Sequence, residues 1–124
     1  MVPSCGAVKK SVAFATGAGV PPDHIVIDPG LGFAKEPVHT YEALARLNDF
    51  GELGRPLLVG PSRKRFLTRA LGADVPPAAR DWATAAAVAA AVFGGAHIVR
   101  VHAVREMVQV ARVSDEIRKY HRAD

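Results

Sequence analysis

A run of cations follows an aliphatic segment in the stretch LLVGPSRKRFL, from Leu57 to Leu67. We expect Ser62 to cap a short helix there, whose exposed backbone amides would favour an anion. Arg63 and Lys64 add donors at the same place, and Gly60 allows the backbone to approach a ligand closely. This part of the chain therefore predicts a binding site for a negatively charged group.

Two further polar groups stand where apolar runs end. Asp28 closes the run HIVID, and a lone carboxylate can accept two parallel hydrogen bonds from a guanidine, an aminopyrimidinone or a pterin. Arg100 and His102 lie two positions apart in HIVRVH, so a strand would place them on one face, where the charge of Arg100 needs a partner. Taken singly, each feature has a structural explanation: an Asp before Pro-Gly commonly forms a turn, a basic run commonly faces solvent, and a histidine in a strand commonly has its hydrogen bonds satisfied within the fold. Together they indicate one anion site.

Short β-branched runs alternate with helical patterns along the chain, which is typical of parallel β/α units. We expect three strands, at 24–28, 56–60 and 97–102, and helices at 38–50, just after residue 62, at 81–93 and from 104 onward. Residues 11–20 have the pattern of the end of another helix. Ligands bind at the carboxyl ends of parallel strands, so the three polar groups should converge. The periodicity fits both an open doubly wound sheet and a closed barrel.

The composition indicates one globular domain: 124 residues, of which 49% are hydrophobic and 23% charged. The net charge of +4 permits an acidic partner, but aromatic residues make up only 6% and none alternates with the cationic run. Single-stranded nucleic acid would require such stacking residues, so we expect no nucleic-acid partner. Cys5 is the only cysteine, which excludes an internal disulfide and a cysteine metal cluster and favours a cytoplasmic location.

Several other functions do not fit the residue spacing. The chain lacks the G-x-x-x-x-G-K-[ST] loop, the G-x-S-x-G elbow and the H-E-x-x-H zinc motif. The uncharged residues 82–99 reach the lower limit for a membrane span, but alanine dominates them and Gly94-Gly95 interrupts them. We expect two soluble elements there, no membrane partner and no secretory signal at the start of the chain.

Three segments, IDPGLGFAK, LLVGPSRKRFL and GAHIVRVHAV, resemble dihydropteroate synthase in their order and spacing. The resemblance covers residues 12–124 and leaves 1–11 unmatched, which allows these first residues to be disordered. It implies the C-terminal part of a (β/α)8 barrel, about three β/α units within a single domain segment. The barrel-versus-sheet question is answered by this resemblance alone.

The resemblance also implies roles for individual residues. Asp28 would hold the pterin amino-pyrimidinone edge, and Lys64 the pterin carbonyl and ring. Ser62 and Arg63 would meet p-aminobenzoate, and Lys64 and Arg63 are the expected catalytic residues. The remaining expected substrate-binding residues are Phe33 beside the p-aminobenzoate ring, Gly60 in the cationic loop, and Arg100 with His102 on pyrophosphate.

The implied reaction joins 6-hydroxymethyl-7,8-dihydropterin pyrophosphate to p-aminobenzoate and releases pyrophosphate, giving 7,8-dihydropteroate for folate biosynthesis. Mg²⁺ would accompany the pyrophosphate, held by no residue of this chain. Sulfonamides would compete, and the last two helices would form a homodimer surface. Two departures stand near the implied site: Ala103 replaces the acid of the usual R-V-H-D-V motif, and Thr40 replaces an asparagine.

Three hypotheses remain open. In the first, the chain belongs to a dihydropteroate synthase and is active only when missing strands complete the barrel, which typically needs ~250 residues; the chain then begins inside a gene. The second hypothesis is a non-catalytic pterin- or anion-binding paralogue. The third is a related pterin-dependent methyltransferase domain.

Overall fold

Three short parallel segments form the centre of the molecule, a computed structural model that describes residues 3–32 and 36–121. Strand β1 (Leu58–Val59) pairs in parallel with β2 (Ile98–Val99), and on its other side Ile27 forms a single parallel bridge to Leu57. The Leu58 amide donates to the Ile27 carbonyl at 2.8 Å. The three strand segments therefore occur where expected and in parallel.

The strands are shorter than the sequence predicted. Before the first one, Pro22–His24 forms a 3-10 turn (η1), so only Ile27 joins the ladder. The Arg100 amide still donates to the Val59 carbonyl at 2.9 Å, one residue beyond β2. The segment that follows β1 then leaves the sheet at Pro61, which has no amide hydrogen to donate. The expected strands at 24–28, 56–60 and 97–102 are thus wrong in length.

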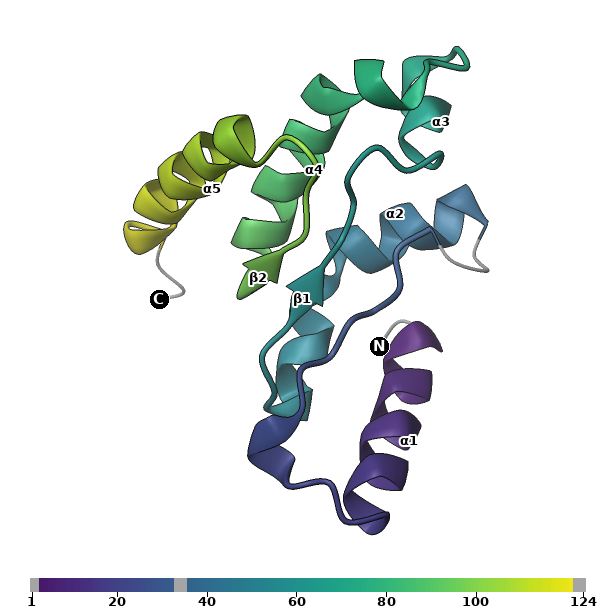
Figure 1. Cartoon of the computed structure of the whole chain (residues 1–124), viewed down its shortest axis with the longest axis vertical. Helices are drawn as coiled ribbons and strands as arrows, with labels where there is room; N and C mark the ends of the chain where they lie inside the picture. Colours follow the sequence, from purple (N-terminus) through teal and green to yellow (C-terminus); the bar gives the residue numbers. More distant parts are fainter. Residues whose placement is uncertain (1–2, 33–35, 122–124) are drawn as a thin grey trace.

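The helices follow the predicted order. They are α2 (Pro37–Ala45), η2 (Leu47–Leu53), α3 (Leu67–Leu71), η3 (Pro77–Ala79), α4 (Asp81–Phe93) and α5 (Val104–Lys119). Helix α4 has the predicted bounds, whereas the predicted helix 38–50 is divided because Arg46 leaves helical geometry at φ −113° and ψ 33°. Figure 1 shows β1 and β2 side by side, with α4 and α5 to one side and α1 to the other.

Helix α1 (Pro3–Gly17) contains residues 3–11, and for these residues it corrects the expectation that allowed 1–11 to be disordered. Cys5 is completely buried in the core, and Val8 and Val12 pack against that core. These three residues have the i, i+3, i+7 spacing of one helix face. Their small side chains and the intervening lysines made this pattern weak in the sequence.

The hydrophobic core lies between the strand segments and the helices that cover them. Val59 from β1, Leu47 and Phe50 from η2, and Val88 and Ala91 from α4 are fully buried. Burial of each of the larger side chains is worth ~1.5–3 kcal/mol, so this core holds the strand segments and the helices together. Among the described residues, no helix is both long and apolar enough to cross a membrane.

Candidate functional site

The loops that follow the three strand segments meet at one end of the sheet. Arg100 Nη1 lies 3.4 Å from Asp28 Oδ2, which connects the first loop to the third. Both side chains are half-exposed. The Arg100 guanidinium passes directly over Gly60, where an added Cβ would lie 2.8 Å from Arg100 Cζ. The absence of a side chain at Gly60 is therefore what allows Arg100 to reach Asp28.

Lys64 connects the second loop to the first. Its Nζ donates a hydrogen bond to the Leu31 carbonyl at 2.7 Å, and its Cδ would lie 3.1 Å from a Cβ placed on Gly32. Gly32 also has a positive φ of 82°, which favours glycine. The amino group of Lys64 is thereby held above the turn that follows Asp28.

Ser62 and His102 connect the second loop to the third. Ser62 Oγ lies 2.6 Å from His102 Nδ1, and the His102 amide donates to the same oxygen at 3.0 Å. Ser62 does not cap a helix, because α3 begins five residues later at Leu67 and its N-cap has no side-chain hydrogen bond. The expected helix start, and the anion attraction of its amides, is therefore wrong.

A small cavity lies between these loops. It has a volume of about 130 Å³ and is lined by Gly60, Ser62, Lys64, Arg100, Val101 and His102. At ~30 Å³ for each water molecule, that is room for about four waters or a small ion. Lys64, Arg100 and His102 can all donate hydrogen bonds, so the lining suits an anion. Five of the lining residues are ones that the sequence predicted for the site.

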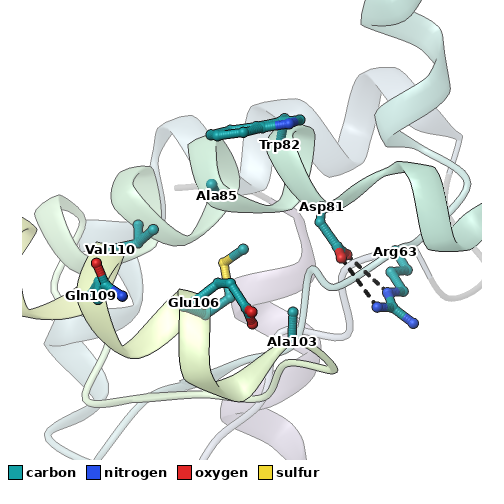
Figure 2. Close-up of a pocket in the computed structure, with 9 residues that line it drawn as sticks. Arg63, Asp81, Trp82, Ala85, Ala103, Glu106, Gln109 and Val110 are labelled. Carbon is teal, nitrogen blue, oxygen red and sulfur yellow. Dashed lines mark hydrogen bonds and ion pairs between the residues drawn. The ribbon is translucent and has the colours of Figure 1, made fainter.

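Arg63 lies away from this cavity, although it precedes Lys64 in the chain. It has a left-handed backbone, with φ 57°, and its guanidinium makes two hydrogen bonds to the Asp81 carboxylate, at 2.9 and 3.1 Å. Figure 2 shows this pair at one end of a groove between α4 and α5 that also includes Trp82 and Glu106. The structure therefore does not bring the Arg63 side chain together with Lys64.

The start of α4 holds Arg63 through its backbone as well. The Arg63 amide donates to Oγ1 of Thr84 at 3.0 Å, and Arg80 Nη1 donates to the Arg63 carbonyl at 2.8 Å. The hydrogen bond from Arg63 lowers the pKa of the Asp81 carboxyl, and the same bond raises the pKa of Arg63. These contacts support the unusual backbone at Arg63, whose cost is of order 1–3 kcal/mol.

Residues that sequence reasoning did not assign hold the loops in place. Thr40, noted only as a departure, is fully buried and its Oγ1 accepts a hydrogen bond from the Gly32 amide at 3.3 Å. Thr84 and Asp81 hold Arg63 from a position about twenty residues further along the chain. The spacing of hydrophobic residues in the sequence predicts which face of an element is buried. It does not predict which side-chain hydroxyl will accept a hydrogen bond from which backbone amide, so the sequence carried no signal for these contacts.

The remaining expectations concern Phe33 and a metal. Phe33 lies outside the described residues. Among the described residues, no group of three or more His, Cys, Asp or Glu side chains could hold a metal ion. Asp28 is the carboxylate of the site, and its oxygens interact with Arg100 and with the Gly30 amide, at 2.8 Å for the latter. Mg²⁺ is usually held by one or two carboxylates together with waters and substrate phosphates, so its presence beside pyrophosphate stays a prediction.

Curated relatives match most of this chain. A dihydropteroate synthase of Synechocystis is 46% identical over 107 residues, which cover 86% of this chain and 36% of the relative. The Mycobacterium leprae dihydropteroate synthase is 48% identical over 103 residues, covering 80% and 36%. The chain thus spans about a third of the length of these curated relatives.

Solved structures give the same result for the fold. A dihydropteroate synthase from Coxiella burnetii in complex with pteroic acid superposes with a TM-score of 0.89 at 30% identity, over 95% of this chain and 43% of that one. A Yersinia pestis dihydropteroate synthase with a sulfonamide drug complex gives 0.88 at 32% identity, over 95% and 42%. The predicted fold class, part of a (β/α)8 barrel, is confirmed.

The family model described as "Pterin binding enzyme" matches residues 5–102, which is more than three-quarters of the sequence and includes all three loops of the site. The chain belongs to the family of pterin-binding enzymes.

Proposed function

We propose that this chain supplies the pterin- and pyrophosphate-binding end of a dihydropteroate synthase-type transferase. The observation that carries the proposal is the junction of the three loops, where Asp28 meets Arg100, Lys64 meets the Leu31 carbonyl and Ser62 meets His102. The named activities of the curated relatives and the complexes of the structural neighbours with pteroic acid and with a sulfonamide support the same assignment.

In this proposal the acidic and the basic side chains of the site bind different parts of the substrate. The Asp28 carboxylate accepts hydrogen bonds from the amino-pyrimidinone edge of the pterin, and Lys64 donates to its carbonyl side. Arg100 and His102 donate to the pyrophosphate. The ion pair between Asp28 and Arg100 is half-exposed and therefore worth little, ~0–1 kcal/mol, so substrate groups can replace it at small cost.

The chemical step follows from this division. The bond between the pterin methylene carbon and the pyrophosphate oxygen breaks, and its electron pair leaves with the pyrophosphate. The amine nitrogen of p-aminobenzoate attacks the same carbon and loses one proton to water. Donors aimed at the leaving group stabilise the negative charge that develops on it. Mg²⁺, when bound to pyrophosphate, would add charge neutralisation on the same group.

A second candidate function is binding without catalysis. It is favoured by one observation, the placement of Arg63 in a pair with Asp81 rather than at the cavity, since Arg63 was expected to take part in catalysis. Replacing the corresponding part of the Synechocystis relative with this chain distinguishes the two. Turnover of labelled p-aminobenzoate that Lys64→Ala abolishes supports the transferase. Pyrophosphate binding without turnover supports the second candidate.

We also propose that the chain alone forms no measurable dihydropteroate, because it spans about a third of its relatives' length. Within residues 3–32 and 36–121, no further strand pairs with either edge of the sheet, and unpaired edges favour association. Exposed apolar side chains on α4 and α5, including Trp82 (90% exposed) and Ile117 (54%), suit a homodimer surface. Sedimentation velocity on the wild type and on Ile117→Glu checks this, since the substitution should give monomers. A cytoplasmic location remains part of the proposal.

The binding test uses inorganic pyrophosphate and isothermal titration calorimetry. Arg100→Ala should weaken binding by about tenfold or more, since a charge-assisted hydrogen bond is worth ~1.5–3 kcal/mol. Arg65→Ala is the matched control, because Arg65 belongs to the same cationic run but does not line the cavity. Equal affinities of the wild type and Arg100→Ala would contradict the proposed site.

A further inference from the structure

The hydroxyl group of Ser62 makes two hydrogen bonds with the same residue, His102. Its Oγ lies 2.6 Å from His102 Nδ1 and accepts a hydrogen bond from the His102 amide at 3.0 Å. Only 7% of Ser62 is exposed, whereas His102 is exposed at the cavity. The imidazole ring is therefore held on one side by a buried serine and open on the other.

The hydrogen-bond capacity of the hydroxyl decides which ring nitrogen carries the proton. A serine hydroxyl has one hydrogen to donate and two lone pairs to accept. If Nδ1 carried a proton, Oγ would accept from both Nδ1 and the His102 amide, and its own hydrogen would have no protein acceptor among the described residues, only water in the cavity that Ser62 also lines. A buried hydroxyl left unsatisfied costs ~1–3 kcal/mol, so the burial of Ser62 favours donation to Nδ1. If Oγ–H donates to Nδ1, every group is satisfied.

We propose that Ser62 is a positioning residue that holds the His102 ring in one tautomer, with the proton on Nε2, and so makes Nε2–H a fixed donor at the cavity. The proposal rests on the anion site proposed above. It differs from the role that resemblance gave to Ser62, contact with p-aminobenzoate, because the hydroxyl hydrogen and one of the two lone pairs are directed at His102.

A residue that acts through another predicts non-additive substitutions. Pyrophosphate affinity is measured by calorimetry for the wild type, Ser62→Ala, His102→Ala and the double variant. His102→Ala should weaken binding by about tenfold, as expected for a lost hydrogen bond to a charged group. Ser62→Ala should weaken it by a smaller factor, and the double variant should resemble His102→Ala alone. Losses that multiply in the double variant would show that Ser62 contacts the ligand directly and would overturn the proposal.

A second measurement does not depend on the anion. The ¹⁵N chemical shifts of the His102 ring, recorded where the ring is neutral, report its tautomer. The wild type should show an unprotonated Nδ1 and a protonated Nε2, Ser62→Ala should show a mixture, and Ser62→Thr should restore the single form because it keeps the hydroxyl. A wild-type ring protonated on Nδ1 would overturn the proposal even if Ser62→Ala fails to fold.

The two measurements separate this proposal from the one on which it rests. If wild-type protein binds no pyrophosphate but the ring has the single Nε2–H tautomer, the anion site is wrong and the role of Ser62 in holding the ring stands. If pyrophosphate binds and the tautomer does not respond to Ser62→Ala, the anion site stands and the positioning role is wrong.

Discussion

Replacing Gly60 with alanine should separate ligand binding from folding in this protein. The added Cβ would lie 2.8 Å from Arg100 Cζ and 3.1 Å from Arg100 Nε, with Nη2 closer still. Favourable carbon–carbon contacts are at about 3.5–4.0 Å, so the guanidinium must move by roughly 0.7 Å or more. Gly60 does not have a positive φ, so alanine strains no backbone there. The collision is with the end of a flexible, half-exposed side chain, which can leave its place.

The magnitudes follow from what that movement breaks. The pair between Arg100 and Asp28, at 3.4 Å, is half-exposed, so its loss should change the free energy of unfolding by only ~0–1 kcal/mol. A displaced Arg100 no longer donates to a bound anion, which removes a charge-assisted hydrogen bond of ~1.5–3 kcal/mol. At ~1.4 kcal/mol for each factor of ten, pyrophosphate affinity should fall by ~10- to 100-fold.

The assay compares four proteins by calorimetry with pyrophosphate and by urea unfolding: wild type, Gly60→Ala, Arg100→Ala and Gly51→Ala. Gly51 is the matched control because an added Cβ there meets nothing within 4 Å. Gly60→Ala should bind as weakly as Arg100→Ala and unfold near the wild-type urea concentration. Affinity within ~2-fold of the wild type, with Arg100→Ala impaired, would refute the claim that Gly60 sets the place of Arg100.

The sequence predicted the parallel order of the strand segments and the bounds of α4 because each depends on local composition. The alanine-rich run from Asp81 to Phe93 is flanked by a proline-rich loop and by Gly94-Gly95, so both ends are marked in the sequence. The convergence of Asp28 with Arg100 was predicted from topology, since the carboxyl ends of parallel strands meet at one edge. The lengths of the strands were not predictable, because a strand ends where its neighbouring strand turns away and no longer forms backbone hydrogen bonds with it.

The sequence could not separate the neighbouring cations. Arg63 and Lys64 are adjacent in a cationic run. The pattern of apolar and charged residues around them does not indicate which hydrogen-bond partner each side chain will have. In the folded chain the left-handed backbone at Arg63 directs its side chain to Asp81, whereas Lys64 reaches the Leu31 carbonyl. The partners lie 18 and 33 residues away, beyond the range of any local pattern. The same limit applies to Ser62, whose partner His102 lies 40 residues further along.

Three further predictions concern the contacts that hold the loops and the core. Phe50→Ala should lower the free energy of unfolding by ~3–5 kcal/mol, measured in urea, because Phe50 is completely buried and its loss leaves a cavity. Thr84→Val should lower it by ~1–3 kcal/mol, since the Arg63 amide would lose its acceptor, while Thr84→Ser should retain most of the stability. The last prediction is a pH dependence at Asp81, whose pKa is lowered by the hydrogen bond from Arg63. A lowered folded-state pKa means that the pair stabilises the fold fully above the unfolded-state value of ~3.9 and loses this contribution as the pH falls through the lower folded-state value. Asp81→Asn cannot lose a charge, so its urea midpoint should fall less steeply than that of the wild type between about pH 5 and pH 2, and equally steep profiles would mean that the pair contributes nothing to folding.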